Sequence, residues 1–230
     1  MKKIKGILFD FDDTLQDREK AFYEFSLWFL DKYFPGLPED EKQKRVHFMD
    51  VNMDGGYKKR PLYFSELKQA WEWDNSPSLQ TLEDEYNDRL PVHTVLFPDT
   101  VQTLKTLRER GYLLGVVTNG FAPLQHKKLD YSGIREYFKT IVVSGDYPYA
   151  KPDARLFLKA AQDMGLQPEE LAMVGDHPVN DIQGAQRAGM FPVWMKYGFF
   201  SNRPPEKITA VETMSGLLDI FKGSDKEILL

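Results

Sequence analysis

Apolar residues follow two different spacings along the chain, and the change of spacing predicts its organisation. Ile4 to Phe9 form a short apolar run of the kind found in buried strands. Residues 16–93 contain no comparable run, and their apolar positions recur at helical spacing. From Phe97 onward, helical patterns alternate with short apolar runs, which favours a doubly wound α/β fold with a parallel sheet. We therefore expect an α/β core formed by residues 1–15 and 94–230, with an inserted all-helical domain at residues 16–93.

The inserted segment is rich in aromatic residues. Its first predicted helix, at about residues 17–33, carries Phe22, Phe25 and Phe29 at helical spacing, and we expect these rings to lie in the core of the domain. Ser65 has the side chain of a favoured N-cap residue, so a later helix is expected to start there. The other helices of the insertion are expected at about residues 39–51 and 79–90.

The segments after residue 94 alternate between predicted helices and predicted strands. Asp99 is the expected N-cap of a helix that carries Val101 and Leu104. A polar and helical segment is expected between the next two strands. Strands are predicted at residues 113–118, 141–144, 172–175, 191–195 and 208–211, and further helices at 153–164, 181–188 and 215–221.

Two acidic residues follow the first predicted strand. If extended backbone continues as far as Asp12, the side chains of Asp10 and Asp12 point the same way, while Asp13 points the other way. Adjacent carboxylates repel, and each raises the proton affinity of the other unless a cation lies between them. A hard divalent cation, most simply Mg²⁺, is therefore expected at Asp10 and Asp12.

The other unusual polar residues also fall where predicted strands end. Thr118 and Asn119 end the second strand, Lys151 lies in the loop after the third, and Asp176 follows the fourth. In open α/β sheets, ligands bind outside the carboxyl ends of the strands, so these residues are expected on one edge. Carboxylates for a metal, a hydroxyl with backbone amides, and one ammonium group together describe a site for a phosphoryl group.

These residues resemble a known set of motifs. Asp10-Phe-Asp12-Asp13-Thr14, Thr118, Lys151-Pro152, and Gly175-Asp176 with Asn180-Asp181 are similar, in order, to the four motifs of the haloacid dehalogenase (HAD) superfamily, whose members are mostly phosphohydrolases. The helical insertion resembles the C1-type cap of that superfamily. The resemblance implies a Rossmann-like core with strand order 5-4-1-2-3.

The resemblance also implies catalytic roles. Asp10 would be the nucleophile that forms an aspartyl-phosphate. Asp12 would protonate the leaving alcohol and then accept a proton from the attacking water. Mg²⁺ would be held by the Asp10 carboxylate, the Asp12 main-chain carbonyl and Asp176. Dehalogenases proper lack an acid at the place of Asp12, so its presence favours phosphate chemistry over carbon–halogen displacement.

Further residues are implied to bind the phosphoryl group. Thr118, the amides of Asn119 and Gly120, and Lys151 would contact its oxygens. Asp181 would orient Lys151 or a metal-bound water. The residues leave the role of His177 open between contact with substrate and filling of the loop.

We expect a Mg²⁺-dependent phosphatase that acts on a small phosphorylated metabolite, with nucleoside monophosphates as the first substrate hypothesis. One alternative is a phosphosugar mutase of the same superfamily, which would return the phosphoryl group to the sugar. Another is a non-catalytic binding protein on the same fold, against which the presence of Asp10, Asp12, Lys151 and Asp176 argues.

Composition and charge limit which partners, which cysteine chemistry and which location the protein can have. The formal net charge of −5 gives no support to a nucleic-acid polymer or an anionic membrane as partner, and the absence of Cys excludes disulfides, thiol catalysis and Cys-based zinc sites. The first apolar run is interrupted by acids before it reaches the length of a signal peptide, and no window has the length of a membrane span. We expect a cytoplasmic monomer or homodimer.

Overall fold

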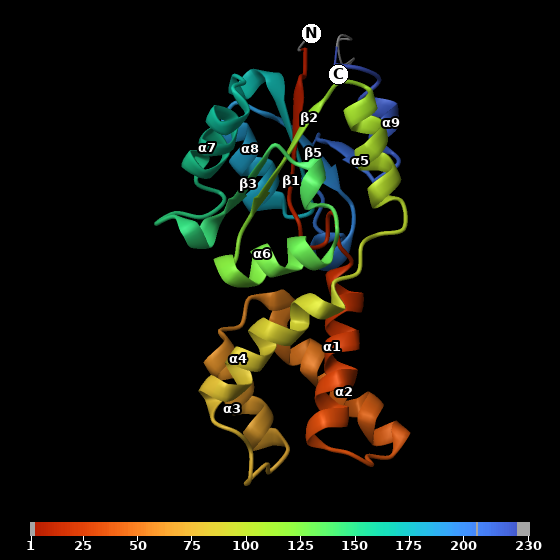
Figure 1. The fold of residues 1–230 in the computed structure, drawn as a ribbon, viewed down its shortest axis with the longest axis vertical. Coiled ribbons are helices and arrows are strands. Elements are labelled where there is room, and N and C mark those ends of the chain that lie inside the picture. The colour runs from red at the N-terminus through yellow and green to blue at the C-terminus, as the bar shows by residue number, and fades with distance from the viewer. Residues whose placement is uncertain (1–2, 206, 225–230) are drawn as a thin grey trace. The chain divides into compact units, whose positions relative to one another are not determined.

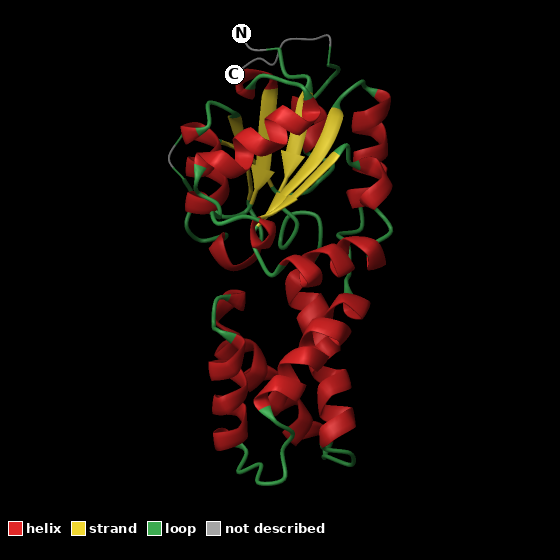
Figure 2. Cartoon of the chain, turned by 60° about the vertical axis from the view of Figure 1, so that its left-hand side comes forward, coloured by secondary structure: helices red, strands yellow, loops and turns green. Residues whose placement is uncertain are grey.

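The computed structural model describes residues 3–205 and 207–224 of the chain, which divides into two compact units. The α/β unit comprises residues 1–18 and 95–230, and the helical unit comprises residues 19–94. Figure 2 shows that all the strands drawn belong to the α/β unit, whereas the helical unit consists of helices and loops. The division expected from the sequence placed these boundaries after residues 15 and 93, whereas the two units meet after residues 18 and 94.

The helical unit contains four α-helices among its residues, all of which the structure describes. Their bounds are α1 (Arg18–Tyr33, whose first residue belongs to the α/β unit), α2 (Glu39–Met53), α3 (Arg60–Ala70) and α4 (Leu79–Arg89). The prediction that Ser65 starts a helix was wrong, because Ser65 lies inside α3 and Lys59 occupies the N-cap position. Pro61 in the first turn is the better start signal, since the missing N–H of proline costs nothing there.

Aromatic rings form the core of the helical unit. Phe25 lies at its centre, with ring centroids 6.0 Å from both Phe22 and Phe29 and 5.2 Å from Tyr86 of α4. All four side chains are buried. The expected role of the α1 aromatics is thus confirmed: they hold the helices of this unit together and need no ligand to explain their presence.

The described residues of the α/β unit form a six-stranded parallel sheet with the order β3-β2-β1-β4-β5-β6. This confirms the order 5-4-1-2-3, and β6 adds one edge strand beside β5. The strands are β1 (Gly6–Phe9), β2 (Leu113–Thr118), β3 (Thr140–Val143), β4 (Leu171–Gly175), β5 (Phe191–Met195) and β6 (Thr209–Val211).

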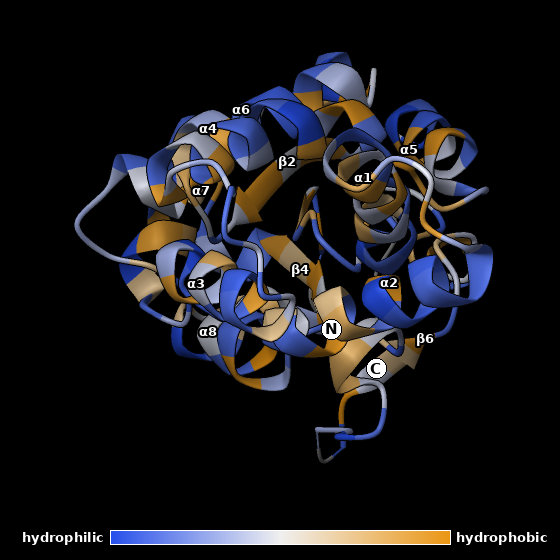
Figure 3. Ribbon diagram, turned by 90° about the horizontal axis from the view of Figure 1, so that it is seen from below, coloured by the Kyte–Doolittle hydropathy of each residue, from blue (hydrophilic) through white to orange (hydrophobic). Residues whose placement is uncertain are grey.

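Helices cover both faces of this sheet. In Figure 1, α7 (Ala154–Met164) and α8 (Gly184–Arg187) lie on one side, with α5 (Thr100–Glu109) and α9 (Leu217–Ile220) on the other. Leu8 of β1 packs in the core cluster of the α7 face, whereas Ile7 and Phe9 pack in the cluster of the α5 face. Burial on both faces explains why the strands are continuous apolar runs, and Figure 3 shows β2 and β4 in the colour of hydrophobic residues.

Three helix predictions in this unit need correction. Val101 of α5 is 44% exposed, and the inward face of that helix is formed by Thr100, Thr103 and Leu104 instead. Asp99 occupies the N-cap position of α5, but its side chain accepts a hydrogen bond from the Ser215 amide (2.7 Å) and caps nothing. The helix expected at 181–188 begins earlier, as a π-helical segment at Pro178–Gln183 that leads into α8.

Candidate active site

The predicted site residues lie at the carboxyl ends of the strands. Asp10 directly follows β1, Thr118 is the last residue of β2, and Asp176 directly follows β4. Because β2, β1 and β4 are parallel neighbours, their carboxyl ends share one edge of the sheet. The Asp10 amide donates to the carbonyl of Val174 (2.9 Å), so the backbone is still held to β4 where the nucleophile candidate begins.

Lys151 connects the acids at this edge. Its buried Nζ donates to Asp10 Oδ1 (2.7 Å), to Asp181 Oδ1 (2.6 Å) and to the Val117 carbonyl (2.8 Å). All three donors of the ammonium group therefore have partners. Burial opposes the charge on Lys151, but the two carboxylates outweigh it, so the pKa of Lys151 is raised and the group stays ionised.

Asn119 holds the backbone of Lys151 in place. Its side-chain Nδ2 donates to the Lys151 carbonyl (3.0 Å), and its Oδ1 accepts from the Lys151 amide (2.9 Å). The side chain of Asn119 thus fixes the loop that carries the lysine, which leaves only its main-chain amide for the predicted contact with phosphoryl oxygens. The Gly120 amide donates to Ser144 Oγ (3.0 Å) in this arrangement.

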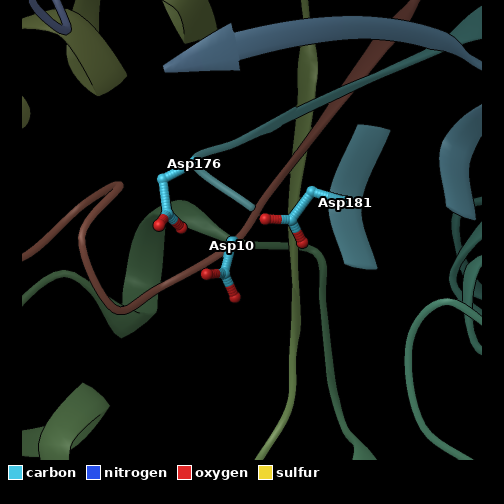
Figure 4. A group of neighbouring side chains, drawn as sticks. All are labelled: Asp10, Asp176 and Asp181. Carbon is cyan, nitrogen blue, oxygen red and sulfur yellow. The ribbon is translucent and has the colours of Figure 1, made fainter. Parts of the chain in front are cut away.

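Three carboxylates gather beside Lys151, and Figure 4 shows them close together: Asp10 follows β1, Asp176 follows β4, and Asp181 lies in the segment Pro178–Gln183. Asp10, Asp176 and Asp181 are all buried and offer oxygens within 4.8 Å of one another. Burial, with the charge of Asp181, raises the pKa of Asp10 to about 6 even though Lys151 acts to lower it. Burial, followed by the charges of Asp181 and Asp10, raises the pKa of Asp176 as well. When all three carboxyl groups are ionised, their negative charge exceeds the single positive charge of Lys151.

Asp12 lies in a different set of contacts. Lys128 Nζ donates to both of its carboxylate oxygens (2.8 and 3.0 Å), Gln125 Nε2 donates to Oδ2 (2.9 Å), and Gln16 donates to Oδ1. The burial of Asp12 would raise its pKa, but these donors, with Lys128 first, lower it overall. Strand alternation had suggested that the side chains of Asp10 and Asp12 share one cation. The structure contradicts this, because β1 ends at Phe9 and the extended backbone does not continue to Asp12.

Sequence reasoning missed the two α6 residues that hold Asp12. Gln125 and Lys128 lie three residues apart on α6 (Ala122–Tyr131), and both are buried. Gln125 Nε2 also donates to Thr118 Oγ1 (2.9 Å), so it links the predicted phosphate-binding hydroxyl to the predicted acid–base residue. Their spacing of three residues was the available signal, since it places both side chains on one helix face.

His177 takes a structural position. Its Nδ1 accepts hydrogen bonds from the amides of Val179 (3.1 Å) and Asn180 (3.2 Å), which caps the π-helical segment that carries Asp181. Its ring packs on Phe200 with centroids 4.0 Å apart. Burial and then Lys151 lower the pKa of His177, which keeps the ring neutral and Nδ1 able to accept. Of the two roles left open, filling and fixing the loop is the one these contacts describe.

Known proteins similar to this chain are consistent with such a site. The family of haloacid dehalogenase-like hydrolases matches residues 7–195. A relative from Methanopyrus kandleri named glyceraldehyde 3-phosphate phosphatase is 34% identical over 206 residues, 88% of each chain. A protein from Thermus thermophilus named phosphoserine phosphatase is 40% identical over 47% of this chain and 44% of its own. The solved structure of the HAD-hydrolase YfnB from Bacillus subtilis, described as bound to magnesium, has a TM-score of 0.74 at 25% identity and covers 95% of this chain and 99% of that one.

No helix within residues 3–205 and 207–224 combines the length and the apolar character that crossing a bilayer needs.

Proposed function

This chain belongs to the haloacid dehalogenase-like hydrolase family and is a phosphoric monoester hydrolase, and on that premise we propose that it is a Mg²⁺-dependent phosphatase that works through an aspartyl-phosphate at Asp10. The observation that carries the proposal is the charge at the sheet edge. Three buried carboxylates, those of Asp10, Asp176 and Asp181, face the single ammonium group of Lys151. When ionised they leave two negative charges uncompensated, which matches one divalent cation.

The donor set favours a hard divalent cation, most simply Mg²⁺. The gathered atoms are carboxylate oxygens, and the described residues near them offer no thiolate. Asp10 and Asp176 would be the side-chain ligands, the Asp12 main-chain carbonyl a further one, and Asp181 would orient Lys151. When bound, the cation would neutralise the repulsion between the Asp10 carboxylate and the phosphoryl oxygens.

In the first half-reaction, an oxygen of Asp10 attacks phosphorus while the bond from phosphorus to the alcohol oxygen breaks. Lys151 and Thr118 stabilise the charge on the phosphoryl oxygens, and Asp12 gives its proton to the departing alcohol. The pKa of Asp12 is lowered by Lys128, so its proton affinity rises only when the negatively charged phosphoryl group arrives beside it.

In the second half-reaction, ionised Asp12 accepts a proton from the water that attacks the aspartyl-phosphate. Phosphate leaves and Asp10 is free again. The lowered pKa of Asp12 suits this step, because a base has to be ionised before it can accept a proton. Both halves need the same residue in opposite protonation states.

The substrate class is a small phosphomonoester. The relatives described above bear the names of phosphatases for glyceraldehyde 3-phosphate and phosphoserine, both small phosphates. We propose that the helical unit acts as a cap that excludes water and supplies contacts to the part of the substrate beyond phosphorus. Nucleoside monophosphates remain a hypothesis to be tested beside the smaller phosphates.

A phosphate-release screen tests the proposal. Purified protein with Mg²⁺ is incubated with glyceraldehyde 3-phosphate, phosphoserine, phosphoglycolate, sugar phosphates and nucleoside monophosphates, and free phosphate is measured. We expect release from at least one of them, its loss on addition of EDTA, and its return with excess Mg²⁺. Turnover that persists in EDTA would contradict the role given to the carboxylates. Interconversion of sugar phosphates with little free phosphate would indicate the mutase instead.

A further inference from the structure

Lys128 is a buried lysine whose charge is directed at one partner. It lies on α6 with its side chain 7% exposed, and its ion pair in the described structure is with Asp12. Burying an ammonium group is costly unless a carboxylate compensates it, so a lysine at this position needs a reason. The compensating carboxylate is that of Asp12, so the reason for the lysine is to be found in what it does to Asp12.

The contacts of Asp12 show how its carboxyl group is held. Oδ1 accepts from Lys128 and Gln16, and Oδ2 accepts from Lys128 and Gln125. These donors fix both the position and the plane of the group. The Asp12 side chain still keeps 23% of its surface exposed, so it remains open to a substrate while Lys128 lies on its buried side.

The same contacts direct Asp12 toward the phosphate site. Gln125 Nε2 donates to Asp12 Oδ2 and to Thr118 Oγ1, each at 2.9 Å. One amide group therefore sets the distance between the predicted acid and a predicted phosphate ligand. The oxygen of the leaving alcohol is bonded to that phosphorus, so the proton has to be delivered beside Thr118.

We propose that Lys128 is a positioning residue for proton transfer, which holds the Asp12 carboxyl group where the leaving alcohol receives its proton. The proposal rests on the phosphatase function proposed above. A protonated carboxyl group has one O–H donor and keeps acceptor capacity on its other oxygen. Lys128 contacts both oxygens, so it retains one contact while the second oxygen carries the proton to the alcohol. Lys128 itself exchanges no proton and forms no bond to substrate.

The test compares two substrates that differ in their need for that proton. Phenyl phosphate releases a phenol as weakly acidic as a tyrosine side chain, with a pKa of about 10, whereas p-nitrophenyl phosphate releases a much more acidic phenol that departs without help. The measured quantity is kcat/KM, because in a two-step mechanism it reports the steps up to alcohol release and leaves out hydrolysis of the aspartyl-phosphate.

We expect Lys128→Met to lower kcat/KM for phenyl phosphate by about 10- to 100-fold and to change that for p-nitrophenyl phosphate by less than about threefold. Asp12→Asn should show the same preference more strongly. Lys128→Arg should restore most of the loss, because a guanidinium group also donates to both oxygens of a carboxylate. The matched control is Lys127→Met, since this neighbour on α6 makes none of the contacts with Asp12 described above and should leave both values unchanged.

A double variant separates positioning from general stabilisation. If Lys128 acts through Asp12, then Lys128→Met should cause no further loss in an Asp12→Asn background. Three results would overturn the proposal. The first is an equal loss of kcat/KM on the two substrates, the second is an additive loss in the double variant, and the third is a gain of activity in Lys128→Met. Melting curves check the fold, and Lys128→Gln replaces Lys128→Met if the latter is unfolded. Wild-type protein inactive on both esters and on the metabolite panel would instead refute the phosphatase function itself.

Discussion

Gly175 and Asp181 are packed so closely that a side chain at position 175 has no room. A Cβ atom built on Gly175 would lie 2.4 Å from both Cγ and Oδ2 of Asp181. Asp181 in turn accepts from Lys151 Nζ and, through Oδ2, from the His177 amide (2.9 Å). The glycine at the end of β4 therefore permits the contact that holds the lysine of the site.

Gly175→Ala should disturb this contact and reduce activity. The added methyl group meets the buried carboxylate of Asp181, which cannot move without losing Lys151, so we expect a loss of about 1–3 kcal/mol in the free energy of unfolding. Phosphate release should fall by at least tenfold. Gly216→Ala is the control, because a Cβ atom at position 216 would lie 3.3 Å from its nearest neighbour, the Thr213 carbonyl oxygen, and the φ of Gly216 is −59°. This variant should be milder in both measurements. Equal effects of the two variants would refute the steric explanation.

Magnesium should stabilise the protein in a pH-dependent way. The pKa of Asp10 is raised from 3.8 to about 6, so the stability that this group contributes is present below pH 4 and is lost as pH rises through about 6. The metal-free protein should therefore lose stability over this window. Cations compete with protons for the same oxygens, so Mg²⁺ should restore it above pH 6 and have little effect at pH 5.

Thermal melting with and without Mg²⁺ at matched ionic strength measures this effect. At pH 8 and a Mg²⁺ concentration of about 100 times Kd, we expect a rise in Tm of about 5–10 °C. Asp176→Asn should remove most of the rise. A Mg²⁺ effect as large at pH 5 as at pH 8 would contradict the assignment of the cation to these carboxylates.

The sheet was predictable because its signals are local. β2 and β5 have the bounds expected from the sequence, since each is an apolar run enclosed by turn residues and buried on both faces. The order of the strands came from resemblance, because periodicity carries no information on which strands are neighbours. At Ser65 the local signal misled: a favoured N-cap residue lies inside α3, where Pro61 and the packing of Tyr63 and Phe64 decide the helix.

The site was predictable only in part, because the sequence pattern gives the positions of strand ends but not the directions of single side chains. Asp10, Lys151 and Asp176 come together because parallel strands bring their ends to one edge, a rule that applies to any such sheet. The direction of the Asp12 side chain depends on the exact residue where β1 stops, and no pattern fixes that to within one residue. Lys128 looks like any solvated lysine of a polar helix until the fold brings α6 beside Asp12 and Thr118.

His177→Ala should destabilise the protein and spare the chemistry. Loss of the imidazole leaves the amides of Val179 and Asn180 without an acceptor at the start of the π-helical segment, which should cost about 1 kcal/mol. His177→Asn should lose less, because asparagine is a favoured N-cap residue. Melting temperature and the KM for the best substrate separate the two roles. A KM that rises equally in both variants would show that the ring contacts substrate.

Asp10→Asn should abolish turnover while leaving the fold intact or more stable. An amide is a poor nucleophile, so we expect phosphate release to fall by roughly 10⁴-fold or more, the scale seen when a nucleophile is removed from other hydrolases. Lys151 keeps its contacts with Asp181 and the Val117 carbonyl, and the buried acidic group loses one of its repelling charges. The metal-free variant should therefore melt at or above the wild-type temperature at pH 8. Asp219→Asn, which changes an exposed acid, is the control and should alter neither quantity. Turnover within tenfold of wild type in a folded Asp10→Asn protein would exclude Asp10 as the nucleophile.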